Sequence, residues 1–132
     1  MSKEEIGERL KEIRKEKHIK IYELELGENA IYSIEKASRS YSVSNLIIMC
    51  NALGVKLEIT DTYVGQSFPV SSISECHLVI ATIMDRYEID QKMLYRITGR
   101  YYTLPKGKKQ PLSIDMLLAI CNALHCEIGL LM

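Results

Sequence analysis

The densest group of basic side chains in this chain lies between Gln91 and Ile114. The stretch contains no aspartate or glutamate, and its local charge of +6 comes from Lys92, Arg96, Arg100, Lys106, Lys108 and Lys109. Lysine and arginine side chains bind phosphate oxygens, so a stretch of this kind predicts contact with nucleic acid. A basic loop that is only solvated is the alternative interpretation.

The chain as a whole is electrically balanced, and its composition is that of an ordinary folded protein. Among its 132 residues, 17 lysines and arginines stand against 17 aspartates and glutamates, 47% are hydrophobic and three are prolines. These values exclude the disordered, collagen-like and fibrous classes. A nucleic-acid-binding protein normally has an excess of basic residues or one basic face. Because the net charge of this chain is zero, nucleic-acid binding would require a basic face.

Cysteine and histidine residues offer one other possible chemistry. The pairs Cys76-His77 and His125-Cys126 could supply four zinc ligands, but adjacent side chains point in different directions and no C-x-x-C pair occurs. We therefore expect the four cysteines to be reduced, buried thiols, with no metal and no cofactor. Because the sequence shows no Ser-His-Asp arrangement, paired-carboxylate signature or phosphate-binding glycine-rich loop, we do not expect an enzyme.

The apolar runs of the chain are short. The longest include residues 78–81 and 116–121, whereas a helix needs roughly 20 apolar residues to span a bilayer. Glu4 and Glu5 stand where a secretion signal would have a basic patch followed by an apolar run. We expect a cytoplasmic protein without a membrane partner.

Two copies of one sequence unit organise the chain. Residues 46–59 align with residues 117–130 at an offset of 71 and share the string Cys-Asn-Ala-Leu. Residues 19–24 align with residues 89–94 at an offset of 70. The segment between the copies is rich in serine and contains Gly65 and Pro69, which is typical of a linker. The sequence thus predicts a first domain at 1–59, a linker at 60–75 and a second domain at 76–132.

Hydrophobic spacing predicts several short helices and one strand in each copy. Ile6, Leu10 and Ile13 recur at helical spacing, and further helices are expected at about 21–26, 28–36 and 42–53. Residues 55–59 alternate apolar and polar side chains, as a half-buried strand does, and residues 126–130 occupy the same place in the second copy. Since a lone strand is unstable, the two strands should pair within the chain or across a homodimer formed through the C-terminal strands.

Several segments resemble the lambda-repressor-like, Xre-type helix-turn-helix family. Residues 6–17 are similar to the first helix of that family, and the string Ala52-Leu53-Gly54-Val55 is similar to the end of its last helix. In the second copy, residues 89–94 resemble the start of the second helix, and residues 106–111 resemble the basic loop after the third. The expected fold class is therefore mainly α: two tandem small helix-turn-helix domains, each followed by a short β-strand that can pair.

The resemblance implies that the third helix of each copy enters the major groove of double-stranded DNA, while the start of the second helix and the following loop contact phosphates. In the first copy the implied contacts are Asn29, Tyr32, Ser33, Lys36 and Arg39. In the second copy they are Gln91, Arg96, Arg100, Tyr102, Thr103, Lys106, Lys108 and Lys109. Asparagine and arginine can each form two hydrogen bonds with one base, adenine and guanine respectively.

Two functional hypotheses remain open at this point. The first is a sequence-specific transcriptional regulator that presents two similar helices about a pseudo-two-fold axis, with the basic second copy dominating the DNA contact. The second is a non-enzymatic protein-interaction or dimerisation module on a degenerate helix-turn-helix fold. Pro105 favours the second hypothesis, because it stands where the first copy has Glu35 and would end the third helix early.

Overall fold

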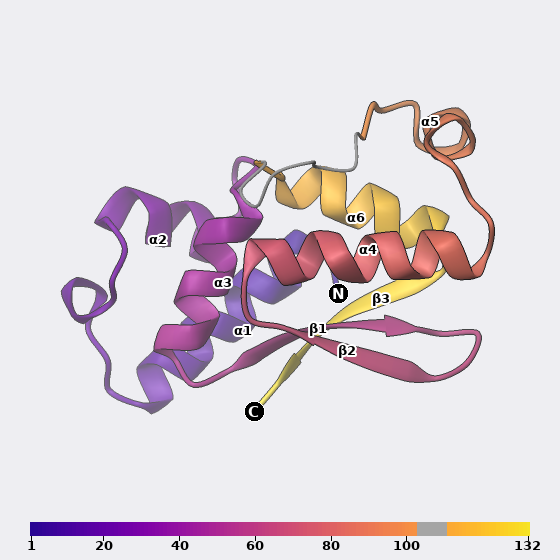
Figure 1. Ribbon diagram of the computed structural model, residues 1–132. Helices are drawn as coiled ribbons and strands as arrows, with labels where there is room; N and C mark the ends of the chain where they lie inside the picture. Colours follow the sequence, from indigo (N-terminus) through magenta and orange to yellow (C-terminus); the bar gives the residue numbers. More distant parts are fainter. Residues whose placement is uncertain (103–110) are drawn as a thin grey trace.

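The computed structural model describes residues 1–102 and 111–132, which combine helices with a three-stranded antiparallel sheet (Figure 1). The first copy forms α1 (Lys3–Glu16), the 3-10 helix η1 (Ile21–Glu23), α2 (Glu28–Lys36), α3 (Val43–Ala52) and β1 (Lys56–Asp61). Then follow β2 (Gln66–Val70), α4 (Ile73–Arg86), α5 (Gln91–Thr98), α6 (Ile114–Ala123) and β3 (Cys126–Leu131). The expected fold class, mainly α with short strands, is confirmed.

The two copies begin with the same kind of helix cap, which their sequences encode locally. Ser2 Oγ accepts a hydrogen bond from the backbone N–H of Glu5, and the Glu5 carboxylate accepts one from the N–H of Ser2. Ser72 Oγ accepts the equivalent hydrogen bond from the N–H of Glu75 at the start of α4. Such caps satisfy N–H groups that have no partner within the helix.

Residues 60–75, which were expected to form a linker, instead contain the end of β1, a turn, β2 and the start of α4. Gly65, at a φ of +68°, donates its N–H to the carbonyl oxygen of Asp61 at 2.8 Å and closes the turn. Val70 is buried, whereas Pro69 is exposed. A proline fits here because β2 is an edge strand of the β2-β1-β3 sheet. The small residues that suggested a linker therefore encode a hairpin and a helix cap.

An internal pseudo-two-fold axis relates the two copies. Strands β1 and β3 pair, as expected; the pairing is antiparallel and lies within the chain, and Glu58 lies opposite its own counterpart Gly129. Ser42 and its counterpart Ser113 also face each other in an antiparallel bridge. The N–H of Val43 donates to the carbonyl oxygen of Leu112, and the symmetry-related N–H of Ile114 donates to that of Tyr41, both at 2.8 Å. The copies are thus joined as two subunits of a symmetric dimer would be.

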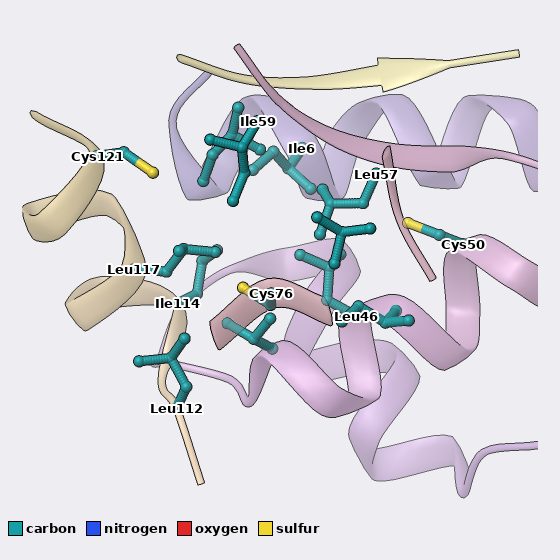
Figure 2. Packing of buried hydrophobic residues seen from close by; sticks show 14 of the residues in the cluster. Ile6, Leu46, Cys50, Leu57, Ile59, Cys76, Leu112, Ile114, Leu117 and Cys121 are labelled. Atoms are coloured by element: carbon teal, nitrogen blue, oxygen red, sulfur yellow. The ribbon is translucent and has the colours of Figure 1, made fainter. Parts of the chain in front are cut away.

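The copies share one hydrophobic core (Figure 2). Leu57 and Ile59 of β1 point toward the helices together with Ile6 of α1, and side chains of the second copy such as Ile114 and Leu117 join the same cluster. Each copy alone would leave part of this apolar surface exposed to water, which costs about 25 cal/mol per Å². The described residues of the two copies therefore form one packed body.

Candidate nucleic-acid interface

Helix α2 corresponds to the helix that is expected to read DNA in the first copy, and it packs closely against α1. Its Ile31 and Ile34 are fully buried. Gly7 of α1 lies so near that a Cβ at this position would collide with the carbonyl oxygen of Ile34. A glycine is required for this approach of the two helices, and it sets the orientation of α2 on the core.

A buried ion pair holds the C-terminal end of α2. The Arg14 guanidinium donates two hydrogen bonds to the Glu35 carboxylate, at 2.7 and 2.9 Å, and a third to the carbonyl oxygen of Ile19. The hydrogen bonds with Glu35 raise the pKa of Arg14. Because the Glu35 side chain is 3% exposed and paired, it adds little negative charge to the outer face of α2.

The outer face of α2 carries most of the residues that the sequence assigned to DNA contact in the first copy. Asn29, Tyr32 and Lys36 of this helix are exposed, as is Arg39, three residues beyond its end. The Lys36 ammonium lies 5.3 Å from the centre of the Tyr32 ring, which aligns a cation and an aromatic ring on one surface. Ser33 is half-buried, and its hydroxyl donates to the carbonyl oxygen of Asn29 within the helix, so it is less available for a base.

The second copy has neither the glycine nor the arginine by which α1 holds α2 in the first copy. At an offset of 70, His77 stands in the place of Gly7 and Met84 in the place of Arg14. His77 is buried, and its Nδ1 lies 2.7 Å from the hydroxyl oxygen of Tyr102. His77 thus places a side chain where the first copy has only the hydrogen atom of Gly7, the position at which α2 approaches α1.

Among the expected contact residues that the structure describes, Tyr102 is the one that is buried. It was predicted to face outward, as its counterpart Tyr32 does, but it is 5% exposed and its hydroxyl is bonded to His77. A tyrosine can bury its ring when its hydroxyl finds a partner, and His77 supplies that partner.

The remaining predicted residues of the second copy divide into two groups. Arg96 and Arg100 are exposed on and just after α5, and Gln91 is half-buried in its first turn. Asp90 caps this helix by accepting a hydrogen bond from the N–H of Met93. Four predicted contacts lie outside the described residues, namely Thr103, Lys106, Lys108 and Lys109.

Two exposed tyrosines beside this basic group were not among the predicted contacts. Tyr95 and Tyr101 are exposed, as is Lys92 of the basic group, and the two tyrosine rings touch at a centroid distance of 5.2 Å. Helical spacing places Tyr95 near Lys92, but the position of Tyr101 follows Gly99, whose positive φ ends the helix and changes the chain direction.

The cysteines are buried, as predicted. Burial raises the pKa of Cys50 and Cys76 to about 12 and that of Cys126 to about 11, which keeps these thiols protonated near neutral pH. Within residues 1–102 and 111–132, no three histidine, cysteine or acidic side chains converge in a way that could hold a metal ion.

The described helices include none that is long and apolar enough to cross a membrane. No family model, curated protein or solved structure matches this chain. Its function must therefore be inferred from the exposed side chains of α2 and α5 and from the symmetry that relates the two copies.

Proposed function

We propose that the protein is a cytoplasmic transcriptional regulator that binds double-stranded DNA, with α2 in the major groove and the basic surface of the second copy on the neighbouring backbone. The internal pseudo-two-fold axis carries this proposal. It joins Ser42 to Ser113 at the centre, and α2 and α5 lie toward opposite ends of the molecule, both away from the sheet (Figure 1). At the offset of 70, α5 corresponds to η1 and not to α2, so the two ends present different elements to DNA. In helix-turn-helix proteins one such element reads bases and the start of the second helix contacts phosphates.

The side chains on α2 suit a groove. Asn29 is exposed at the N-terminal end of the helix, where the resemblance places base contacts, and its amide can form two hydrogen bonds with adenine. Lys36 and Arg39 follow at its C-terminal end, where they can neutralise phosphates. The Gly7 contact and the Arg14–Glu35 pair keep these groups in one orientation, which sequence-specific readout requires.

The two copies contribute unequally to the electrostatics. The described part of the second copy presents Lys92, Arg96 and Arg100 on or after α5, whereas the first copy has exposed Glu25 and Glu28 near the start of α2. We therefore infer that the second copy supplies most of the salt-dependent affinity and that α2 supplies most of the base selectivity.

The experiment is a selection of bound duplexes from random DNA, followed by titration of the selected duplex at several salt concentrations. Affinity should fall by about 10³-fold or more between roughly 50 and 200 mM salt if six or more phosphates are contacted. Arg96→Ala and Arg100→Ala should each reduce the slope of log affinity against log salt by about 0.9. Asn29→Ala should instead reduce the preference for the selected base at one position by about tenfold.

Lys56→Ala is the matched control, because Lys56 is an exposed cation on β1, whereas α2 and α5 lie away from the sheet (Figure 1). It should change neither the slope nor the selectivity. Failure to select any duplex at low salt, with the fold intact, would overturn the proposal and favour the protein-interaction alternative.

A further inference from the structure

Helix α5 exposes more aromatic and apolar surface than a helix on a folded core normally does. Leu94 is its only buried residue. Tyr95 is 47% exposed, and Tyr101, just beyond the helix, is 81% exposed. A tyrosine at such a position gains little from the hydrophobic effect, so packing does not account for it.

These tyrosines border a hollow of about 460 Å³ that is lined by Gln91, Lys92, Tyr95, Arg96 and Tyr101. Gln91 and Tyr95 are four residues apart on α5, as are Lys92 and Arg96, so each pair lies on one side of the helix. The hollow is thus bordered by two aromatic rings, two cations and an amide, and none of the described residues that line it is acidic.

The two rings are held together without closing over the hollow. Their planes are inclined at 55° with centroids 5.2 Å apart, an edge-contact geometry that tyrosine pairs favour. Tyr95 supports Tyr101 from one side, and the high exposure of Tyr101 shows that much of its ring is open to solvent. An exposed ring beside two cations suits a flat, anionic ligand.

We propose that this hollow binds an unpaired nucleotide of a single-stranded nucleic acid, with its base stacked on Tyr101 and its phosphate held by Lys92 and Arg96. Stacking on tyrosine beside a basic groove is a general means of binding single strands. Bases inside a duplex are already stacked on each other, so Tyr101 has no base face to bind there. The inference goes beyond the proposed duplex binding and does not depend on it, since α2 takes no part in the hollow.

A free nucleotide offers the same chemistry as a nucleotide within a strand. Both carry an aromatic base and a phosphate, and the hollow is large enough for either. The experiment therefore uses two probes, an oligothymidylate of twelve nucleotides and adenosine monophosphate.

The first copy provides a matched control for Tyr101. Tyr22 is 71% exposed, and the Lys20 ammonium lies 5.8 Å from its ring centre. Glu23 and Glu25 are exposed near it in sequence, however, and both line a separate, acidic hollow. Tyr22 thus has comparable exposure and a neighbouring cation but lacks the basic environment of α5.

Affinity for the labelled oligothymidylate is measured by fluorescence anisotropy at low salt. Tyr101→Ala should weaken binding about tenfold, the effect expected for loss of one stacked base, whereas Tyr22→Ala should leave it unchanged. Arg96→Ala should lower the salt slope by about 0.7, whereas Lys56→Ala should not. An abasic strand of the same length, which keeps the phosphates but lacks bases, should bind at least tenfold more weakly than oligothymidylate.

A tryptophan at position 101 reports stacking directly, because the chain contains no tryptophan of its own. The Tyr101→Trp protein should retain affinity, and its fluorescence should be quenched by the bound strand; Tyr22→Trp fluorescence should be unaffected. Quenching by adenosine monophosphate alone would identify a free nucleotide as the ligand and would still support the site.

Equal binding of the abasic strand, or no quenching of Tyr101→Trp by either probe, would overturn the inference. Duplex binding that depends on Asn29 would survive that result, so the two proposals can fail separately.

Discussion

Ser42 and Ser113, which occupy the same place in the two copies, face each other in an antiparallel bridge. Each also caps a helix, because Ser42 Oγ accepts a hydrogen bond from the N–H of Asn45 and Ser113 Oγ accepts one from the N–H of Met116. Two helix starts, α3 and α6, therefore meet at the axis that relates the copies. The same two serines therefore begin the helices and join the two copies.

Replacing Gly7 with alanine should destabilise the fold. Alanine is normally better than glycine in a helix by up to about 1 kcal/mol, but here its Cβ would collide with the carbonyl oxygen of Ile34. The resulting separation of α1 and α2 should lower the free energy of unfolding by about 1–3 kcal/mol, measured by urea titration. In the control, Gly129→Ala, the Cβ meets the Glu58 side chain at ordinary distances, and stability should hold or rise slightly.

Removing the charge of Arg14 should cost more than removing the whole ion pair. Arg14→Met leaves the nearly buried Glu35 carboxylate without its partner and should lower the free energy of unfolding by about 3 kcal/mol. The double change Arg14→Met and Glu35→Leu should recover most of that loss, because no unpaired charge remains. Urea titrations of the two variants provide the comparison, and equal losses would show that the pair does not act as a unit.

Asp61 should make stability fall in acid. Burial alone would raise its pKa, but hydrogen bonds from the Tyr87 hydroxyl, the Arg86 guanidinium and the N–H of Tyr63 outweigh this effect and lower it. An aspartate in the unfolded chain takes up its proton near pH 4, before the folded one does, so this contribution is present above about pH 4 and is lost as the pH falls further.

The Asp61→Asn protein should consequently be less stable than the parent at neutral pH, and its urea midpoint should depend less on pH below about 4. Tyr87→Phe, which removes one of the hydrogen bonds to Asp61, should show a smaller change in the same direction. Parallel acid limbs for parent and Asp61→Asn would assign the acid sensitivity to other carboxylates.

The thiols should be unreactive in the folded protein. Burial raises the pKa of Cys50, Cys76 and Cys126 to about 12, 12 and 11, and it also raises that of Cys121, so the reactive thiolate is scarce at pH near 8. Titration with a disulfide reagent should detect almost no rapid reaction in buffer and four thiols after unfolding in urea. A rapidly reacting thiol in the folded protein would show local opening near that cysteine.

Much of the fold could be predicted because its signals are local. The helix at residues 28–36 was predicted with the bounds that α2 has, and the strand pairing between the copies was expected from the alternation at residues 55–59. The hairpin strand β2 was not predicted, because Pro69 and its small neighbours are typical of loops and become a strand only beside β1.

The candidate site was less predictable than the fold. The exposure of Asn29, Tyr32 and Lys36 follows from the helical period of α2, which the sequence shows. That Tyr101 is exposed and Tyr102 is buried could not be predicted. These positions depend on the backbone direction after Gly99 and on the hydrogen bond to His77, which lies 25 residues away from Tyr102 in the sequence.

The sequence by itself determined the duplication, the helix caps and the helical and strand periods, since each depends on residues within a few positions of one another. Only the tertiary structure decided that the copies pair about an axis through Ser42 and Ser113 and that Arg14 neutralises Glu35. It also decided that His77, in the place of Gly7, draws Tyr102 inward. These outcomes depend on contacts between residues that are distant in sequence. A single substitution, such as histidine for glycine, changes which helices can pack closely.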